Sequence, residues 1–173
     1  EGVVLALEAA VAAPDVQCHL QAEQRGTGHA VVQAIGACDP NSTVLVLFGD
    51  VPLISKAVLS DVVAASASGV AMLSAYLEDP TGYGRIVRDR DGEFTAVVEE
   101  KDAAPEQLSL QEINTGVLAA NAERLAAWLG RVDNDNAQSE YYLPDVLRLA
   151  REDGVPVTVV CSDNEFNVRG VNT

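Results

Sequence analysis

Thr43-Val44-Leu45-Val46-Leu47-Phe48-Gly49-Asp50 is the stretch of this chain that indicates its fold most clearly. A continuous apolar run of this length, bounded by turn residues, predicts a strand buried on both faces of a parallel sheet. In open α/β sheets, ligands bind beyond the carboxyl ends of the strands. Asp50 follows the apolar residues 43–48 after a single glycine, Gly49, so it lies where a binding site is expected.

Strand-like and helical patterns alternate along the rest of the chain. Asp91-Gly92 between two apolar runs predicts a β-hairpin. Ser55 has the properties of a helix N-cap, and Gly154 those of a residue that ends a helix. Strands are expected at residues 16–20, 43–48, 70–77, 85–87, 94–98, 113–120 and 155–161, and helices at 3–11, from 26 onward, 55–69, 122–129 and 143–152. This alternation predicts a three-layer α/β/α sandwich with a mixed, mostly parallel sheet.

Composition excludes several classes of protein. The chain has 173 residues, of which 48% are hydrophobic, enough for one sizeable core. Eleven Lys plus Arg against 26 Asp plus Glu give a net charge of −15, which argues against a nucleic-acid binder or a polybasic membrane-surface protein. No apolar stretch is long enough to span a membrane. The three scattered cysteines favour a reducing, intracellular compartment.

Asp50 is the most informative single residue. A carboxylate beside a glycine that admits a ligand suits Mg²⁺, which takes one or two protein oxygens and completes its shell with water and phosphate oxygens. An Asp after a strand is also common as a helix N-cap or in an Asx-turn. Both interpretations stay open from this motif alone.

Two further segments carry candidate polar contacts. The loop at residues 21–30 enters a helix through Gly26-Thr27-Gly28, where free N–H groups can hold a phosphate or a base edge. Its His29 is expected to be a structural hydrogen-bonding group. Asn114 interrupts an apolar strand, and a buried amide there needs partners, which a ligand hydroxyl or amide would supply. The pattern shows no nucleophilic triad, zinc motif or Walker loop.

Seven motifs together resemble one family, in the family's order. They are QAEQRGTGHA (21–30), FGDVPLIS (48–55), DPTGYGRIVR (79–88), VVEEKDA (97–103), QEINTGV (111–117), NAQSEYYLPD (136–145) and RGVN (169–172). The resemblance is to the uridyltransferase domain of bacterial N-acetylglucosamine-1-phosphate uridyltransferase, and it covers nearly the whole chain. It implies the Rossmann-like nucleotide-diphospho-sugar transferase fold.

The resemblance also implies a role for each matching residue. Gln21, Gly26 and Thr27 would recognise the uracil. The resemblance thus replaces the phosphate that the loop alone also allows as a ligand. Phe48, Gly49 and Asp50 would line the nucleotide site. The sugar would be held by Gly84, Glu99 and Asn114, with Tyr142 nearby. Mg²⁺ would be the cofactor, with Asp50 and Asn172 as its protein ligands and as the residues assigned to catalysis.

The reaction implied is uridylyl transfer from UTP to N-acetylglucosamine 1-phosphate, which gives UDP-N-acetylglucosamine, a cell-wall precursor, and pyrophosphate. The resemblance further implies a cytoplasmic, homotrimeric parent enzyme whose carboxyl-terminal β-helix is an acetyltransferase. Neither nucleic acid nor membrane is an expected partner.

Two departures from the family pattern affect these expectations. Pro144 stands where many relatives have threonine. In the family, the first strand and the glycine-rich nucleotide loop come before the position that matches Glu1, and the β-helix comes after the position that matches Thr173. Residues 1–173 are therefore expected to form a partial nucleotidyltransferase domain with little turnover alone. The alternatives are transfer to another sugar or from another base, a non-catalytic sugar-nucleotide sensor, and a purely structural α/β domain.

Overall fold

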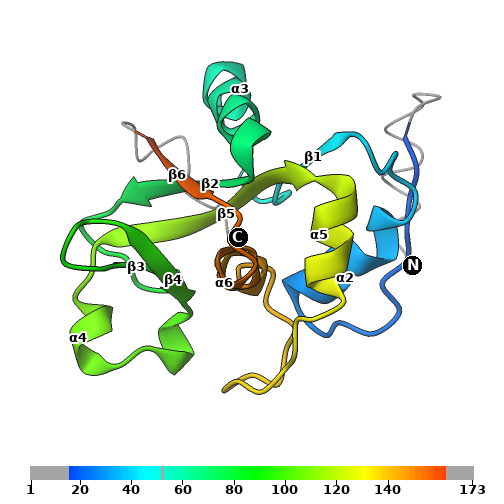
Figure 1. The fold of residues 1–173 in the computed structure, drawn as a ribbon. Helices are drawn as coiled ribbons and strands as arrows, with labels where there is room; N and C mark the ends of the chain where they lie inside the picture. The colour runs from blue at the N-terminus through cyan, green and yellow to red at the C-terminus, as the bar shows by residue number, and fades with distance from the viewer. Residues whose placement is uncertain (1–15, 52, 163–173) are drawn as a thin grey trace.

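A computed structural model describes residues 16–51 and 53–162 of the chain. Its six-stranded sheet has the order β4-β3-β5-β2-β6, and β1 also pairs with β5 (Figure 1). The strands are β1 (Thr43–Val46), β2 (Val70–Tyr76), β3 (Arg85–Arg88), β4 (Phe94–Val98), β5 (Glu112–Asn121) and β6 (Val157–Ser162). The helices are α2 (Thr27–Ile35), α3 (Lys56–Ala65), α4 (Pro105–Leu108), α5 (Ala122–Leu129) and α6 (Asp145–Glu152), with short 3₁₀ turns at Ser66–Ser68 and Glu100–Asp102.

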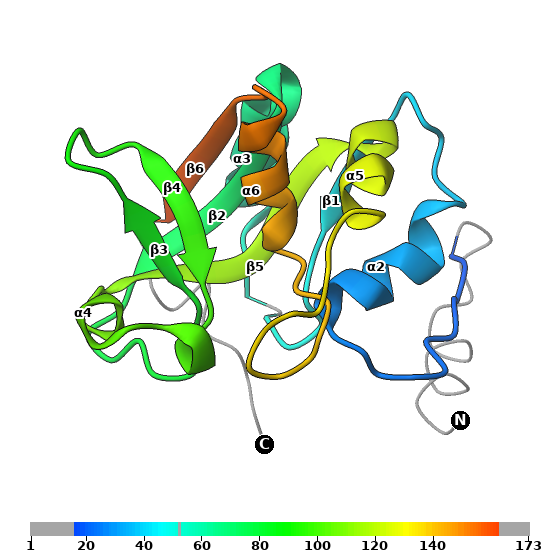
Figure 2. The same ribbon diagram turned by 60° about the horizontal axis from the view of Figure 1, so that its bottom comes forward.

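Helices cover both faces of this sheet, as the three-layer prediction requires. Helix α3 lies on one face, where Val62 packs against alternate residues of β2 and β5. Helices α2, α5 and α6 lie on the other face, where the larger core includes Trp128 and Leu147 (Figures 1 and 2). Successive residues of a strand point to opposite faces, so the fully buried β2 residues Met72 and Leu73 belong to different cores. The α/β/α sandwich is therefore confirmed.

The direction of the strands differs from the prediction. Among the described residues, four of the five strand pairings are antiparallel and only the β2–β6 pairing is parallel, because β5 runs against β1, β2 and β3, and β4 runs against β3. The mixed sheet is confirmed, whereas its mostly parallel pairing is not. Strands β1, β2 and β6 do run in one direction, but β5 separates β1 from the other two.

The stretch at residues 43–48 forms a strand over Thr43–Val46, but this strand is not buried on both faces. Strand β1 pairs antiparallel with β5, and β5 is its single strand neighbour within the described residues. Its residues are half-buried or exposed, and the following Leu47 is 49% exposed. An unbroken apolar run reports a preference for burial, but it does not report how many neighbours the strand has.

Other local predictions can be compared directly. Ser55 caps α3 by accepting a hydrogen bond from the Val58 N–H, and Gly92 in the β3–β4 turn has a left-handed φ of 85°. The strand predicted at 16–20 is wrong, because this exposed segment pairs with no described strand. The predicted helix at 3–11 and the segment at 169–172 lie outside the described residues.

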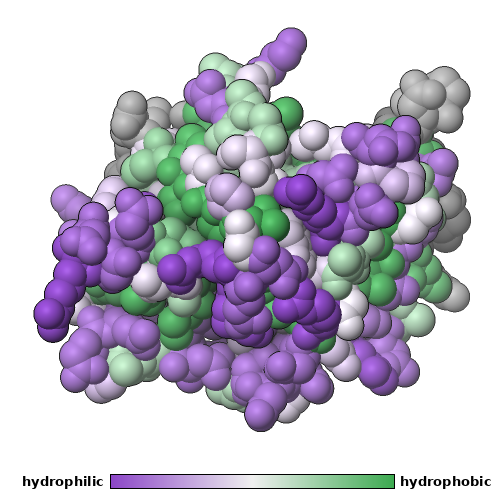
Figure 3. All heavy atoms as spheres, in the orientation of Figure 1, coloured by the Kyte–Doolittle hydropathy of each residue, from purple (hydrophilic) through white to green (hydrophobic). Residues whose placement is uncertain are grey.

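Hydrophilic side chains cover most of the face seen in Figure 3, with hydrophobic residues visible between them. This agrees with the excess of acidic residues in the sequence. Every helix in the described part of the chain is too short or too polar to cross a bilayer.

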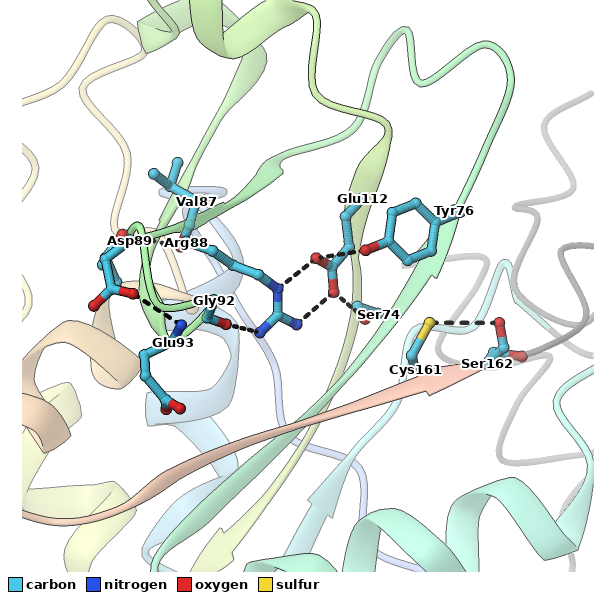
Figure 4. Close-up of polar contacts among 11 residues, drawn as sticks. Ser74, Tyr76, Val87, Arg88, Asp89, Gly92, Glu93, Glu112, Cys161 and Ser162 are labelled. Carbon is cyan, nitrogen blue, oxygen red and sulfur yellow. Dashed lines mark hydrogen bonds and ion pairs between the residues drawn. The ribbon is translucent and has the colours of Figure 1, made fainter.

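An ion pair between partly exposed Arg88 and buried Glu112, together with Ser74, connects three strands near the end of the sheet that carries the hairpin. The Arg88 guanidinium donates from both Nε and Nη2 to the Glu112 carboxylate, each over 2.7 Å (Figure 4). The hydroxyl of fully buried Ser74 donates to the same carboxylate over 2.8 Å, and that of Tyr76 over 3.4 Å. Burial alone would raise the pKa of Glu112, but the hydrogen bonds from Arg88 and Ser74 outweigh it and hold this pKa below its usual value.

We expect Glu112→Gln to lower the free energy of unfolding at neutral pH by about 1–3 kcal/mol, because the charge-assisted bonds to Arg88 are weakened. A depressed carboxyl pKa stabilises the fold above the ordinary glutamate value of 4.5, and this contribution is lost as pH falls through the folded-state pKa. The difference between wild type and variant should therefore narrow in acid, as measured by urea unfolding. Glu93→Gln, at an exposed hairpin position, is the control; a pH-independent difference for Glu112→Gln would contradict this account.

Candidate functional site

The candidate site lies where the outer edge of β5 passes from one neighbouring strand to another. Arg85 at the start of β3 faces Ile113, and Val46 at the end of β1 faces Leu118. Residues 114–117 of β5 have no strand on this edge within the described part of the chain. The ends of β1 and β3 therefore flank an open stretch of β5 backbone, and a cavity of about 320 Å³ forms over it.

The cavity brings together most of the residues assigned from the family resemblance. Those that line it are Thr27, Phe48, Asp50, Gly84, Glu99, Asn114 and Tyr142, and Pro144, which departs from the family pattern, lines it as well. Gln21, Gly26 and Gly49 are not among its lining residues, and Asn172 lies outside the described residues. The nucleotide set and the sugar set thus share one hollow, although they come from segments far apart in the sequence.

Gly116 makes the open stretch of β5 possible. Its φ of 81° is left-handed, and a Cβ at this position would overlap the ring of Phe48. The Asn114 side chain accepts a hydrogen bond from the Gly116 N–H over 3.0 Å through its Oδ1. The Nδ2 group of Asn114 has no acceptor among the described residues, so it is available to donate to a ligand.

Gly84 and Glu99 lie against each other in the lining of the cavity. A Cβ on Gly84 would lie 2.9 Å from Oε1 of Glu99 and 3.1 Å from Val97, so a larger residue would displace the carboxylate. The Gly84 carbonyl accepts from the Asn114 N–H over 2.8 Å, which fixes it to β5. The Gly84 N–H has no acceptor in residues 16–51 and 53–162, so this wall offers one donor and one carboxylate.

Burial raises the pKa of Glu99, and the nearby carboxylates of Asp102 and Asp145 raise it further. The pKa of Asp145 is likewise raised, chiefly by burial. Both residues line an adjoining acidic hollow of about 350 Å³ that shares Tyr142 and Pro144 with the first cavity. Glu99 therefore lies between two hollows in a setting that disfavours its charge.

The loop before α2 is bound to the segment before α6. The Thr27 hydroxyl accepts from the Leu143 N–H over 3.0 Å, and the Gly28 N–H donates to the Tyr141 carbonyl over 2.8 Å. Gly26 has a φ of 103°, and a Cβ there would lie 2.7 Å from the Tyr141 carbonyl oxygen. The close approach of this loop to Tyr141 therefore explains why glycines occur in it. The role of Thr27 and Gly26 in uracil recognition remains a prediction.

Gln21 contacts the same loop from outside the cavity. Its Nε2 donates to the Gly26 carbonyl over 3.2 Å and lies 3.0 Å from Nδ1 of His29. His29 also contacts Gln33, so its structural role is confirmed. Contact between Gln21 and a base remains a prediction.

The turn after β1 presents Asp50 at the cavity. Ser55 caps α3, and the carboxylate of exposed Asp50 accepts no hydrogen bond from the described residues, so neither the N-cap nor the Asx-turn is observed. No cluster of three or more metal-ligating side chains occurs in the described ranges. A single free carboxylate at a cavity fits Mg²⁺, which accepts few protein ligands alongside water and phosphate oxygens.

Some lining residues escaped the sequence analysis. Gly116 and Gln138 lie within two of the sequence motifs, but the motifs alone predict no role for either residue. The Asn-Thr-Gly triplet inside an apolar strand was a usable signal for Gly116, since glycine in a strand marks a bulge or a close approach. Gln138 has no comparable local signal, because its loop reaches the cavity through tertiary contacts.

Comparison with known proteins defines the class. A family model described as nucleotidyl transferase matches residues 6–165. The chain therefore belongs to the nucleotidyl transferase family. Among curated relatives, those named "Bifunctional protein GlmU" from Burkholderia lata and Burkholderia ambifaria are 52% and 53% identical over 96% of this chain. The chain spans 37% of the length of each of these two relatives.

Solved structures share the fold. One is a UDP-glucose pyrophosphorylase complexed with UDP-glucose, with a TM-score of 0.64 and 17% identity over 80% of this chain and 55% of that one. Another is a putative glucose-1-phosphate thymidylyltransferase from Bacillus anthracis, with a TM-score of 0.62 and 16% identity over 82% of this chain and 55% of that one. These similarities confirm the predicted fold class.

We expect Gly116→Ala to destabilise the chain by about 1–3 kcal/mol, because it combines a left-handed backbone with an overlap on Phe48. Thermal unfolding measures the loss. Gly130→Ala is the matched control, since Gly130 has a right-handed φ of −68° and its added Cβ would come no closer than 3.6 Å to a neighbour. Equal effects of the two substitutions would contradict the role assigned to Gly116.

We expect Glu99→Gln to raise the free energy of unfolding at neutral pH. A raised carboxyl pKa means that the folded state binds more protons than the unfolded state, so stability falls as pH rises from the ordinary value of 4.5 through the folded-state pKa. The gain should disappear in acid, which is the opposite of the pH dependence expected for Glu112→Gln. Urea unfolding across pH tests this, and a gain that persists in acid would show another cause.

Proposed function

We propose that this chain takes part, within the protein at its full natural length, in uridylyl transfer, in which N-acetylglucosamine 1-phosphate and UTP give UDP-N-acetylglucosamine and pyrophosphate. The observation that carries the proposal is the shared cavity, whose lining includes Asp50, Gly84, Glu99 and Asn114. The identity of about half to relatives whose printed name is "Bifunctional protein GlmU" supports the same reaction.

The sugar side of the cavity suits a hydroxylated, acylated sugar. The Gly84 N–H and the Asn114 Nδ2 are donors, and the Glu99 carboxylate is an acceptor, so together they can satisfy hydroxyl and amide groups. Glycine at position 84 lets the Glu99 carboxylate lie directly against the backbone, so this donor and this acceptor stay close together. Three converging polar groups in a cavity of this kind fix the orientation of a small ligand.

The chemistry requires no general base. A sugar phosphate has a second pKa of about 6, so at neutral pH it is mostly a dianion that can attack directly. One of its oxygens forms a bond to the α-phosphorus of UTP, and the bond from that phosphorus to the leaving pyrophosphate breaks. The residues of the chain then act by positioning both substrates and excluding alternative orientations.

Asp50 would hold the Mg²⁺ ion, and Asn172 is assigned to it by resemblance. When bound, such an ion neutralises phosphate charge during transfer. No Lys or Arg is among the described residues that line the cavity, whereas Asp50, Glu99 and Glu140 are, so this neutralisation matters for a phosphate bound there.

Ligand binding to the chain tests the proposed specificity. Calorimetry should show saturable binding of UDP-N-acetylglucosamine, tighter than that of UDP-glucose or dTDP-glucose, and Asn114→Ala should weaken it. Transfer is tested on the protein at its full natural length, as pyrophosphate release from UTP with a panel of sugar 1-phosphates. Preference for another sugar or base would redirect the proposal, and no saturable binding to any of them would favour a purely structural domain.

Asp50→Ala is expected to reduce Mg²⁺-dependent transfer by at least about a hundredfold, as loss of a transition-state charge stabiliser does. The rate of pyrophosphate release at saturating Mg²⁺ measures this. Asp61→Ala, at an exposed position on α3, is the matched control and should leave the rate unchanged. An undiminished rate in Asp50→Ala would remove Asp50 from the site, whereas a wild type that binds sugar nucleotide without any transfer would indicate a sensor.

A further inference from the structure

Arg85, the first residue of β3, is buried beside the cavity without lining it. Its side chain is 2% exposed. One guanidinium nitrogen, Nη1, donates to the Tyr83 carbonyl, and Nη2 lies 3.6 Å from Oε1 of Glu100. The other carboxylate oxygen of Glu100 accepts from the Gly82 N–H over 2.9 Å. Arg85 therefore binds a backbone carbonyl of this turn, and Glu100 binds a backbone N–H of the same turn.

This arrangement is poorly explained by stability alone. Burial of a guanidinium is costly unless all its donors are satisfied, yet the Arg85 Nε has no hydrogen-bond partner among the described residues. Arg88, at the other end of the same strand, makes two 2.7 Å bonds to Glu112. Strand β3 thus carries Arg88, which is paired with a carboxylate by two short hydrogen bonds, and Arg85, whose contacts are with the preceding loop and with Glu100.

The contact with Tyr83 determines the direction of a donor at the cavity. The Tyr83 carbonyl and the Gly84 N–H belong to one planar trans peptide unit, so the N–H points opposite to the carbonyl. Because Arg85 holds that carbonyl on the buried side, the Gly84 N–H points away from the guanidinium. Gly84 lines the cavity, and its N–H has no protein acceptor in the described ranges.

We propose that Arg85 and Glu100 are positioning residues that orient the Tyr83–Gly84 peptide, so that the Gly84 N–H donates to the sugar portion of a sugar nucleotide. Glu100 supports this arrangement because it accepts a hydrogen bond from the Gly82 N–H and pairs with the positive charge of Arg85. This inference rests on the proposed function, since it requires the cavity to take a UDP-sugar. It predicts that loss of the pair weakens sugar recognition without weakening nucleotide recognition.

The test compares two probes, UDP-N-acetylglucosamine and UDP, by calorimetry on the chain. Arg85→Met and Glu100→Ala should each raise the Kd of the UDP-sugar about tenfold, as expected for loss of one oriented hydrogen bond, and change the Kd of UDP less than about twofold. Glu100→Gln keeps an acceptor of the same length for Gly82, so it should retain more of the sugar affinity than Glu100→Ala. Because the Glu100 side chain is 34% exposed, its variants decide the question if Arg85→Met fails to fold.

Arg88→Met is the matched control, because it removes an ion-paired arginine from the same strand away from the cavity. It should lower the melting temperature while leaving the ratio of the two Kd values unchanged. An equal change of this ratio in Arg88→Met, or an unchanged ratio in Glu100→Ala, would overturn the inference while sparing the proposed function. A wild-type chain that binds UDP but gains nothing from the sugar would overturn both.

Discussion

The structure depends on how one strand, β5, divides its outer edge between two partners. Strand β3 takes the first part and β1 the last, and the residues between them have no strand to pair with in the described part of the chain. Unpaired buried backbone must be satisfied in another way. The Asn114 side chain accepts from the Gly116 N–H, and Gly116 adopts a left-handed conformation under the Phe48 ring. The cavity exists because these local substitutes replace a strand.

Much of the fold followed from local sequence. The capping serine of α3 and the Asp91-Gly92 hairpin were predictable because each depends on a few adjacent residues. The direction and exposure of β1 were not, since apolar runs of parallel, antiparallel and edge strands look alike. The wrong strand at 16–20 has the same origin, because its apolar residues find no partner strand in the described fold.

The site was predictable in a different way. Asp50 and Asn114 stood out because a polar residue follows or interrupts an apolar strand. Gly84 and Glu99 acquired roles only through the family resemblance, and their proximity follows from β3–β4 pairing across the hairpin. The bond between Thr27 and Leu143 spans 116 positions, so no local pattern could have indicated it.

The two arginines of β3 also fix how this strand aligns with its neighbours. A slip of one residue along a strand turns every side chain to the other face of the sheet. Such a slip would withdraw Arg88 from Glu112 and Arg85 from Glu100 in the same step. A four-residue strand is too short to specify its register by apolar packing alone, so the ion pairs of the arginines at its two ends help to fix that register. Misaligned pairing is therefore penalised at both ends of β3 during folding.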